Sequence, residues 1–131
     1  WVNRAAFKAN YDGMSNSDYV NALYANAGIQ PSPAERQSLV NALDGASETR
    51  AAVLLEVAAN ATFRQKEKNA AFVMMQYFGY LRRNPNDAHD SDFAGLSFWL
   101  DKLNAFGGNY VNAEMVKAFI TSTEYRQRFG P

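Results

Sequence analysis

The chain has 131 residues, no cysteine, and thirteen basic and thirteen acidic residues, so its formal net charge is zero. This balance gives no basic surface for nucleic acid or an anionic membrane, and the lack of cysteine excludes disulfides, thiol chemistry and Cys-ligated metals. Hydrophobic residues make up 47% and aromatic residues 14%, which favours a folded domain over disorder. No apolar run approaches the roughly 18 residues of a membrane span.

In the first half, apolar residues recur at helical spacing, which predicts four helices. A short helix covers residues 1–10, and Ser17 or Asn16 can cap a second helix that ends at Gly28. The run 32–35, Ser-Pro-Ala-Glu, is a strong start signal for a third helix, because Ser32 can cap it and Glu35 completes a capping box. Ser47 can cap a fourth helix. The residues expected to face inward in helices two to four are Tyr19, Val20, Leu23, Tyr24, Ala27, Leu39, Val40, Leu43, Ala51, Val53, Leu54, Val57 and Ala58.

The segment 60–63 indicates a break, and a long helical pattern then runs from about residue 65 to 83. This segment carries so many apolar residues that burial on more than one face is expected. It is therefore the predicted central helix. Its apolar residues are Phe72, Val73, Met75, Tyr77, Phe78 and Leu81.

After a polar loop over residues 84–91, three further start signals follow. Asp92 can cap one helix and Asn112 the next, and Thr121 with Glu124 has the spacing of a capping box that opens a short last helix. Trp99 is expected to be a buried core anchor. The inward residues predicted for these helices are Phe93, Leu96, Trp99, Leu100, Leu103, Met115, Val116, Phe119, Ile120, Tyr125 and Phe129, and no convincing strand is predicted.

The two halves of the chain, about 17–66 and 69–129, follow the same plan, with caps matching caps and core positions matching core positions. The matched core positions are Tyr19, Val20 and Tyr24 with Phe72, Val73 and Tyr77; Leu39, Val40 and Leu43 with Trp99, Leu100 and Leu103; and Ala51, Val53, Leu54 and Val57 with Ala113, Met115, Val116 and Phe119. This pattern indicates an internal duplication, although any two amphipathic helices align to some degree. Two such halves are not expected to bury their apolar faces alone. The sequence therefore predicts one all-α domain over residues 1–131, a compact bundle of about seven to eight helices around the long helix.

No motif identifies a reaction or a ligand. The loop 84–92 holds three aspartates that could bind calcium, but its spacing fails the EF-hand pattern, so a solvated loop is the simpler interpretation. His89 is the only histidine and has no second histidine or cysteine as a zinc partner. The basic pairs Arg82-Arg83 and Arg126 with Arg128 lie near predicted helix ends, where they complement the helix dipole, and an anion site is the alternative.

Several aromatic residues fit the predicted core stripes poorly. Tyr80, Phe98, Tyr110 and Trp1 are the clearest cases. Such rings could line a groove for a partner helix or a sugar. The run 60–62, Asn-Ala-Thr, also matches a glycosylation sequon, although such triplets are common by chance.

The second half resembles the bacterial domain of unknown function family 4214 (DUF4214). That family has a Pro-Asp turn followed by Gly-Leu, two residues and Trp, and then a helix that ends in Phe-Leu before Glu-Phe or Glu-Tyr. The matching residues are Pro85, Asp92, Gly95, Leu96, Trp99, Glu114, Val116, Ala118, Phe119, Ile120, Ser122, Glu124 and Tyr125. The resemblance covers about residues 70–129, with several residues inserted between Pro85 and Asp92. The run from Glu114 to Phe129 is also similar to the helical linker domains of phycobilisomes.

The resemblance implies an all-helical module, without established catalytic residues, that is appended to large exported or surface-associated bacterial proteins. Accordingly no catalytic, cofactor-binding or metal-binding residue is predicted, and no cofactor. The expected function is a non-catalytic structural or protein-interaction module of a larger protein, with a protein partner or a surface glycan and no nucleic acid. The alternative is a carbohydrate-binding module that uses exposed aromatic rings.

Overall fold

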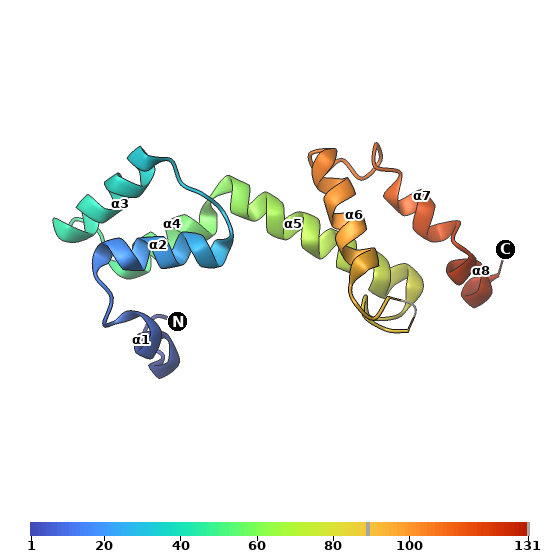
Figure 1. Cartoon of the computed structure of the whole chain (residues 1–131), viewed down its shortest axis with the longest axis horizontal. Coiled ribbons are helices and arrows are strands. Elements are labelled where there is room, and N and C mark those ends of the chain that lie inside the picture. Colours follow the sequence, from blue (N-terminus) through green and yellow to red (C-terminus); the bar gives the residue numbers. More distant parts are fainter. Residues whose placement is uncertain (89, 131) are drawn as a thin grey trace. The chain divides into compact units, whose positions relative to one another are not determined.

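The computed structural model describes residues 1–88 and 90–130, and these residues form eight α helices and one π-helical turn without a strand. The all-α fold class is therefore confirmed. The elements are α1 (Ala5–Tyr11), α2 (Asn16–Ala27), α3 (Pro33–Asp44), α4 (Arg50–Ala59), α5 (Ala61–Gln76), η1 (Tyr77–Leu81), α6 (Ala94–Ala105), α7 (Met115–Ile120) and α8 (Thr123–Phe129), and Figure 1 shows the α helices in chain order.

The chain divides into two compact units, Trp1–Arg64 and Gln65–Pro131, which we call unit 1 and unit 2. The boundary falls inside α5, close to the gap between the two halves expected from the sequence. Each unit has its own cluster of buried apolar residues. This differs from the expectation that neither half could bury an apolar face alone.

In unit 1, α2 packs against both α3 and α4. Tyr19, Val20 and Val53 are completely buried at the centre of this cluster, and Phe7, Tyr11 and Phe63 cover its edge. None of the residues of α1 is buried, and Figure 1 shows this short helix joined to α2 by a short connecting segment. The core of unit 1 is thus a three-helix arrangement to which α1 adds a partial cover.

In unit 2, η1 packs against α7 and α8. Val73 and Tyr77 on α5 and η1, Leu103 on α6 and Met115 on α7 are buried, and Phe119 completes the cluster. Trp99 is half-buried against this cluster, with its ring 5.4 Å from that of Phe119. Trp99 was predicted to be a buried core anchor, and it does pack against the core, but it is only half-buried.

The long helix is confirmed with small shifts. Asn60 separates α4 from α5, and its side-chain oxygen accepts hydrogen bonds from the amides of Thr62 and Phe63, 2.9 and 3.3 Å away. The helix then continues through η1 and ends at Arg82, which has a left-handed backbone. Asn60, the first residue of the sequon, thus directly precedes α5 and accepts hydrogen bonds from amides of its first turn.

Several residues predicted to face inward are instead exposed. Burial of the long helix on more than one face is wrong, because a single face carries Val73 and Tyr77 while Met75 and Phe78 are exposed. The other exposed residues that the sequence predicted as core are Ala51, Ala58, Phe93, Ile120 and Phe129. Helical spacing identified the inward face of each helix, but it did not show where that face ends.

Some of the core positions matched between the two halves agree in burial. Buried residues stand at both members of five matched pairs, namely Val20 and Val73, Tyr24 and Tyr77, Leu43 and Leu103, Val53 and Met115, and Val57 and Phe119. The correspondence is not complete, since Ala51 is exposed while its counterpart Ala113 is buried.

Candidate functional site

The acidic residues of the loop 84–92 each have a partner within the protein. Asp87 accepts a hydrogen bond from the Asn84 amide at 2.7 Å, Asp92 accepts one from the Ala94 amide at 3.0 Å, and Asp90 pairs with Arg83. In the described part of the chain, no three His, Cys, Asp or Glu side chains are grouped so that they could hold a metal ion. His89 lies outside the described residues.

Arg83 joins three segments of unit 2. Its Nε donates to Glu124 on α8 at 2.7 Å, its Nη2 donates to Asp90 at 2.7 Å, and its Nη1 donates to the carbonyl oxygen of Asn84 at 3.1 Å. The guanidinium also lies over the Tyr77 ring, 5.0 Å from the centroid. Burial lowers the pKa of Arg83, but the hydrogen bonds to Glu124 and Asp90 outweigh this effect and raise it.

Some of the residues that the sequence analysis matched to family 4214 lie around this arginine. Gly95, Trp99, Ser122 and Glu124 line a hollow of about 250 Å³ together with Arg83 and other residues of unit 2. A Cβ atom on Gly95 would lie 2.7 Å from the Tyr77 hydroxyl oxygen, so this position has no space for a side chain. The pKa of Tyr77 is raised mainly by burial and, to a smaller extent, by the negative charge of Asp90.

This arrangement is suited to holding segments together. The guanidinium has two carboxylate partners, so its charge is matched within the protein, and both carboxylates accept hydrogen bonds from it. The sequence indicated a helix-end role for Arg83, with an anion site as the alternative. The pairing with Asp90 and Glu124 was missed, because Glu124 is 41 residues away and no local pattern links the two.

The other basic residues lie where the sequence placed them. Arg126 and Arg128 are in the last turn of α8, and Arg128 lies 3.6 Å from Glu124 and donates a hydrogen bond to the carbonyl oxygen of Arg82. Arg128, together with Arg82, Asp87 and other residues, borders a hollow of about 580 Å³. Acidic and basic groups mix there, so the hollow does not present a purely positive surface.

A second candidate is an apolar groove in unit 1, with a volume of about 520 Å³. Core residues of α2 and α4 form the floor of the groove, and α1 forms one wall. Four aromatic rings contribute to the lining, and Arg4 is the one charged residue among the lining residues. The full lining is Trp1, Arg4, Ala6, Phe7, Asn10, Tyr11, Leu23, Asn26, Ala27, Leu54, Val57, Ala58 and Phe63.

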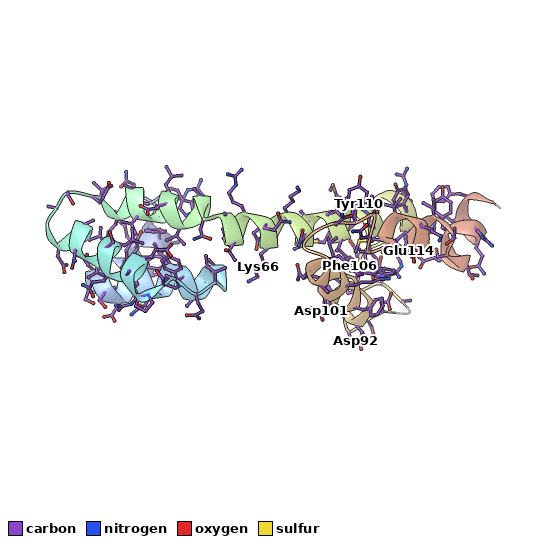
Figure 2. All side chains as sticks on the ribbon, turned by 90° about the horizontal axis from the view of Figure 1, so that it is seen from above. Lys66, Asp92, Asp101, Phe106, Tyr110 and Glu114 are labelled. Atoms are coloured by element: carbon purple, nitrogen blue, oxygen red, sulfur yellow. The ribbon has the colours of Figure 1, made fainter. Side chains whose placement is uncertain are left out.

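A third candidate is the exposed apolar surface of unit 2. Among the described residues, Trp1 and Leu55 are the large hydrophobic side chains exposed in unit 1. Unit 2 has many more, namely Met74, Met75, Phe78, Phe93, Phe98, Phe106, Tyr110, Val111, Ile120 and Phe129. Figure 2 shows Phe106 and Tyr110 on the segment that joins α6 to α7.

Two groups within this surface are defined by their positions on the chain. Met74, Met75 and Phe78 are neighbours on the outer face of α5 and η1, since residues three and four apart on a helix are adjacent. Tyr110 stacks on Phe72, with ring centroids 4.9 Å apart, and remains nearly half exposed. The sequence singled out Phe98, Tyr110 and Trp1 as poor core candidates, and all three are exposed, whereas Tyr80 is half-buried.

Comparisons with known proteins identify no relative of this chain. No protein-family model matches the chain, and neither a curated protein nor a solved structure shows significant similarity to it. In the described residues, none of the helices combines the length and the apolar character needed to cross a bilayer. The functional argument therefore rests on the chain's own surface.

Proposed function

We propose that the chain is a non-catalytic protein-interaction module of a larger bacterial protein that acts outside the cytoplasm. The observation that supports this proposal is the concentration of exposed large apolar side chains on unit 2. A group of neighbouring exposed apolar side chains, such as Met74, Met75 and Phe78, often marks a surface that another molecule covers. The bacterial origin, the larger parent and the export are proposed on the resemblance to family 4214 alone.

The composition of this surface favours a protein partner. Met74 and Met75 have flexible, polarizable side chains that adapt to a partner's shape, and Phe78 beside them offers a rigid apolar area. Methionine and aromatic residues are enriched in protein interfaces, whereas a sugar site needs polar groups that satisfy hydroxyls. We therefore place the contact on the outer face of α5 and η1.

The test is the double substitution Met75→Lys with Phe78→Lys in the 131-residue chain. Two charges at the centre of an apolar contact should weaken binding of a partner by at least about tenfold, which corresponds to about 1.4 kcal/mol. Binding is measured by calorimetry with a purified partner first isolated on the immobilised wild-type chain. A negative heat-capacity change of binding is expected because apolar surface is buried.

The matched control is Leu55→Lys, which also replaces an exposed apolar residue but lies on α4 in unit 1. This variant should bind the partner as the wild type does. Equal binding by the double variant and the wild type would refute the assignment of the contact to α5 and η1. Circular dichroism of all three proteins establishes that the helices are intact.

The second candidate, carbohydrate binding, has its own supporting observation. The Phe98 and Tyr110 rings are exposed, and each is held by a neighbouring ring, Trp99 and Phe72 respectively. Rings fixed in this way can stack on the apolar face of a sugar. A glycan array with the wild-type chain and a Phe98→Ala, Tyr110→Ala variant tests this possibility, and the absence of a glycan that distinguishes the two proteins counts against it.

A further inference from the structure

The groove in unit 1 is separate from the proposed contact on unit 2 and has the properties of a small-ligand site. Leu23, Ala27 and Val57 are buried core residues and line it, while Leu54 and Phe63 are half-buried beside them. Ligand sites in proteins are concave, mostly apolar and about 300 to 1,000 Å³ in volume, and this groove of about 520 Å³ lies within that range.

The wall formed by α1 is attached to the rest of unit 1 at one end. Tyr11 provides this attachment: its hydroxyl accepts a hydrogen bond from Asn26 at 2.8 Å, its carbonyl oxygen accepts one from Arg50 at 2.7 Å, and its ring packs edge-on against Tyr19. No residue of α1 is buried. Trp1 and Arg4, which precede α1, are exposed and can therefore adjust to a ligand without disturbing the core.

The charge of the groove indicates the ligand's chemistry. Arg4 is exposed and lies over the Trp1 ring, 4.6 Å from its centroid, at the edge of the lining. In the described residues, no carboxylate lies within ion-pair distance of Arg4, and no acidic residue lines the groove. The groove thus combines apolar walls with one positive charge that lacks an acidic partner.

We propose that this groove binds a free medium-chain carboxylate, with the apolar chain against α2 and α4 and the carboxylate against Arg4. A volume of about 520 Å³ equals roughly seventeen waters at about 30 Å³ each, and a methylene occupies nearly the same space. Because one side of the groove is open, a chain of about ten to fourteen carbons is the best fit. A cation is disfavoured by Arg4, and a sugar would leave most hydroxyls facing apolar walls.

The first experiment compares ligands on the wild-type chain by calorimetry, each below the concentration at which it forms micelles. From octanoate to dodecanoate, affinity should rise about three- to fourfold for each methylene, as expected for burial of a hydrocarbon chain. Dodecanoate should bind at least about tenfold more tightly than dodecanol, and dodecyltrimethylammonium should bind most weakly. The Trp99→Phe chain provides a second readout, since Trp1 is then the one tryptophan and lines the groove.

Two variants localise the site. Arg4→Met should bring the affinities of dodecanoate and dodecanol to within about twofold of each other, and it should leave the fold intact because the Arg4 side chain makes no capping bond. Ala58→Trp should block the groove and reduce dodecanoate affinity at least tenfold. Its matched control is Ala59→Trp, which changes an exposed neighbour that does not line the groove.

Three results would overturn the proposal. Equal wild-type affinity for dodecanoate and dodecanol would remove the role of Arg4. Equal binding by the Ala58→Trp and Ala59→Trp chains would place the ligand elsewhere. Binding confined to micelles or vesicles would indicate a membrane surface in place of a free carboxylate. None of these measurements depends on the contact proposed for α5 and η1, so either proposal can fail alone.

Discussion

At the scale of single residues, Arg83 links the end of the long helix, the segment after it and the last helix of the chain. Its side chain is about 10% exposed, whereas those of Asp90 and Glu124 are 29% and 30% exposed. Partial exposure weakens each ion pair, because solvent screens the charges. The two bonds still close a long loop, since Arg83 and Glu124 are 41 residues apart.

We expect Arg83→Met to lower the free energy of unfolding by about 2 kcal/mol, mainly because two partly buried carboxylates lose their shared donor. The measurement is urea unfolding followed by circular dichroism. Arg82→Met is the matched control, since Arg82 is exposed and its carbonyl oxygen, which accepts from Arg128, is unchanged. A similar fall in the free energy of unfolding in both variants would mean that the loss of any positive charge here is responsible, and not the loss of the Arg83 bonds to Asp90 and Glu124.

Residue-scale contacts were the least predictable from the sequence. The Tyr24 hydroxyl donates to Glu35 at 2.7 Å, and the sequence had assigned Glu35 to a capping box with Ser32. Ser32 does accept a hydrogen bond from the Glu35 amide, so the local half of that prediction is confirmed. The partner of the carboxylate depends on how α2 meets α3, which local spacing does not specify.

At the scale of helices, most helices were predictable but their first residues were not. The third helix begins at Pro33 after Ser32, as predicted, and Gly28 ends the second in a left-handed conformation. Elsewhere the cap moved by one or two residues: Ser15 in place of Ser17 or Asn16, Thr49 in place of Ser47, and Ser122 in place of Thr121. Each site offers more than one capping residue within three positions, and local spacing does not select among them.

The helices α6 and α7 begin without a side-chain cap. Phe93 and Glu114 precede α6 and α7 with positive φ angles of 60° and 50°, and neither side chain makes a capping bond. Asp92 and Asn112, which the sequence favoured, are not the caps, although Asp92 bonds to the Ala94 amide. Sequence rules did not identify these starts because non-glycine residues rarely adopt such a backbone.

Ser122 provides a test of the observed cap. Its hydroxyl oxygen accepts a hydrogen bond from the Tyr125 amide at 3.1 Å and donates one to the carbonyl oxygen of Phe119 at 2.8 Å. We expect Ser122→Ala to lower the free energy of unfolding by about 1 kcal/mol and Thr121→Ala to lower it by less than about 0.5 kcal/mol. Urea unfolding of the two variants shows which residue caps α8. A larger fall in the free energy of unfolding for Thr121→Ala would support the capping box that the sequence predicted.

At the scale of the whole molecule, helical periodicity specified more than the order of elements. It placed the break at Asn60, the long helix after it and the matched core positions of the two halves. It could not distinguish one shared interior from one core in each unit, because an apolar stripe looks the same in either arrangement. It also missed the apolar groove, which depends on how α1 lies beside α2 and α4.

Both units bury tyrosine hydroxyls, and this gives the chain a common response to alkaline pH. Burial raises the pKa of Tyr19, Tyr24 and Tyr77 above the ordinary value of 10.0, and the hydrogen bond to Glu35 raises that of Tyr24 further. Below pH 10 both folded and unfolded chains keep these protons. Above it the unfolded chain releases them first, so deprotonation favours unfolding.

The free energy of unfolding should therefore fall above about pH 10, by up to about 1.4 kcal/mol per pH unit for each of the three tyrosines, until the pH reaches their folded-state pKa values. Urea unfolding between about pH 9 and 11 measures this slope. Lysines lose their charge in the same range, so the informative quantity is the difference between the wild type and Tyr24→Phe. That variant is less stable at neutral pH, because it lacks the bond to Glu35, but its stability should decline less steeply, by the contribution of one proton. Identical slopes for the two chains would show that Tyr24 does not hold its proton more tightly in the folded state.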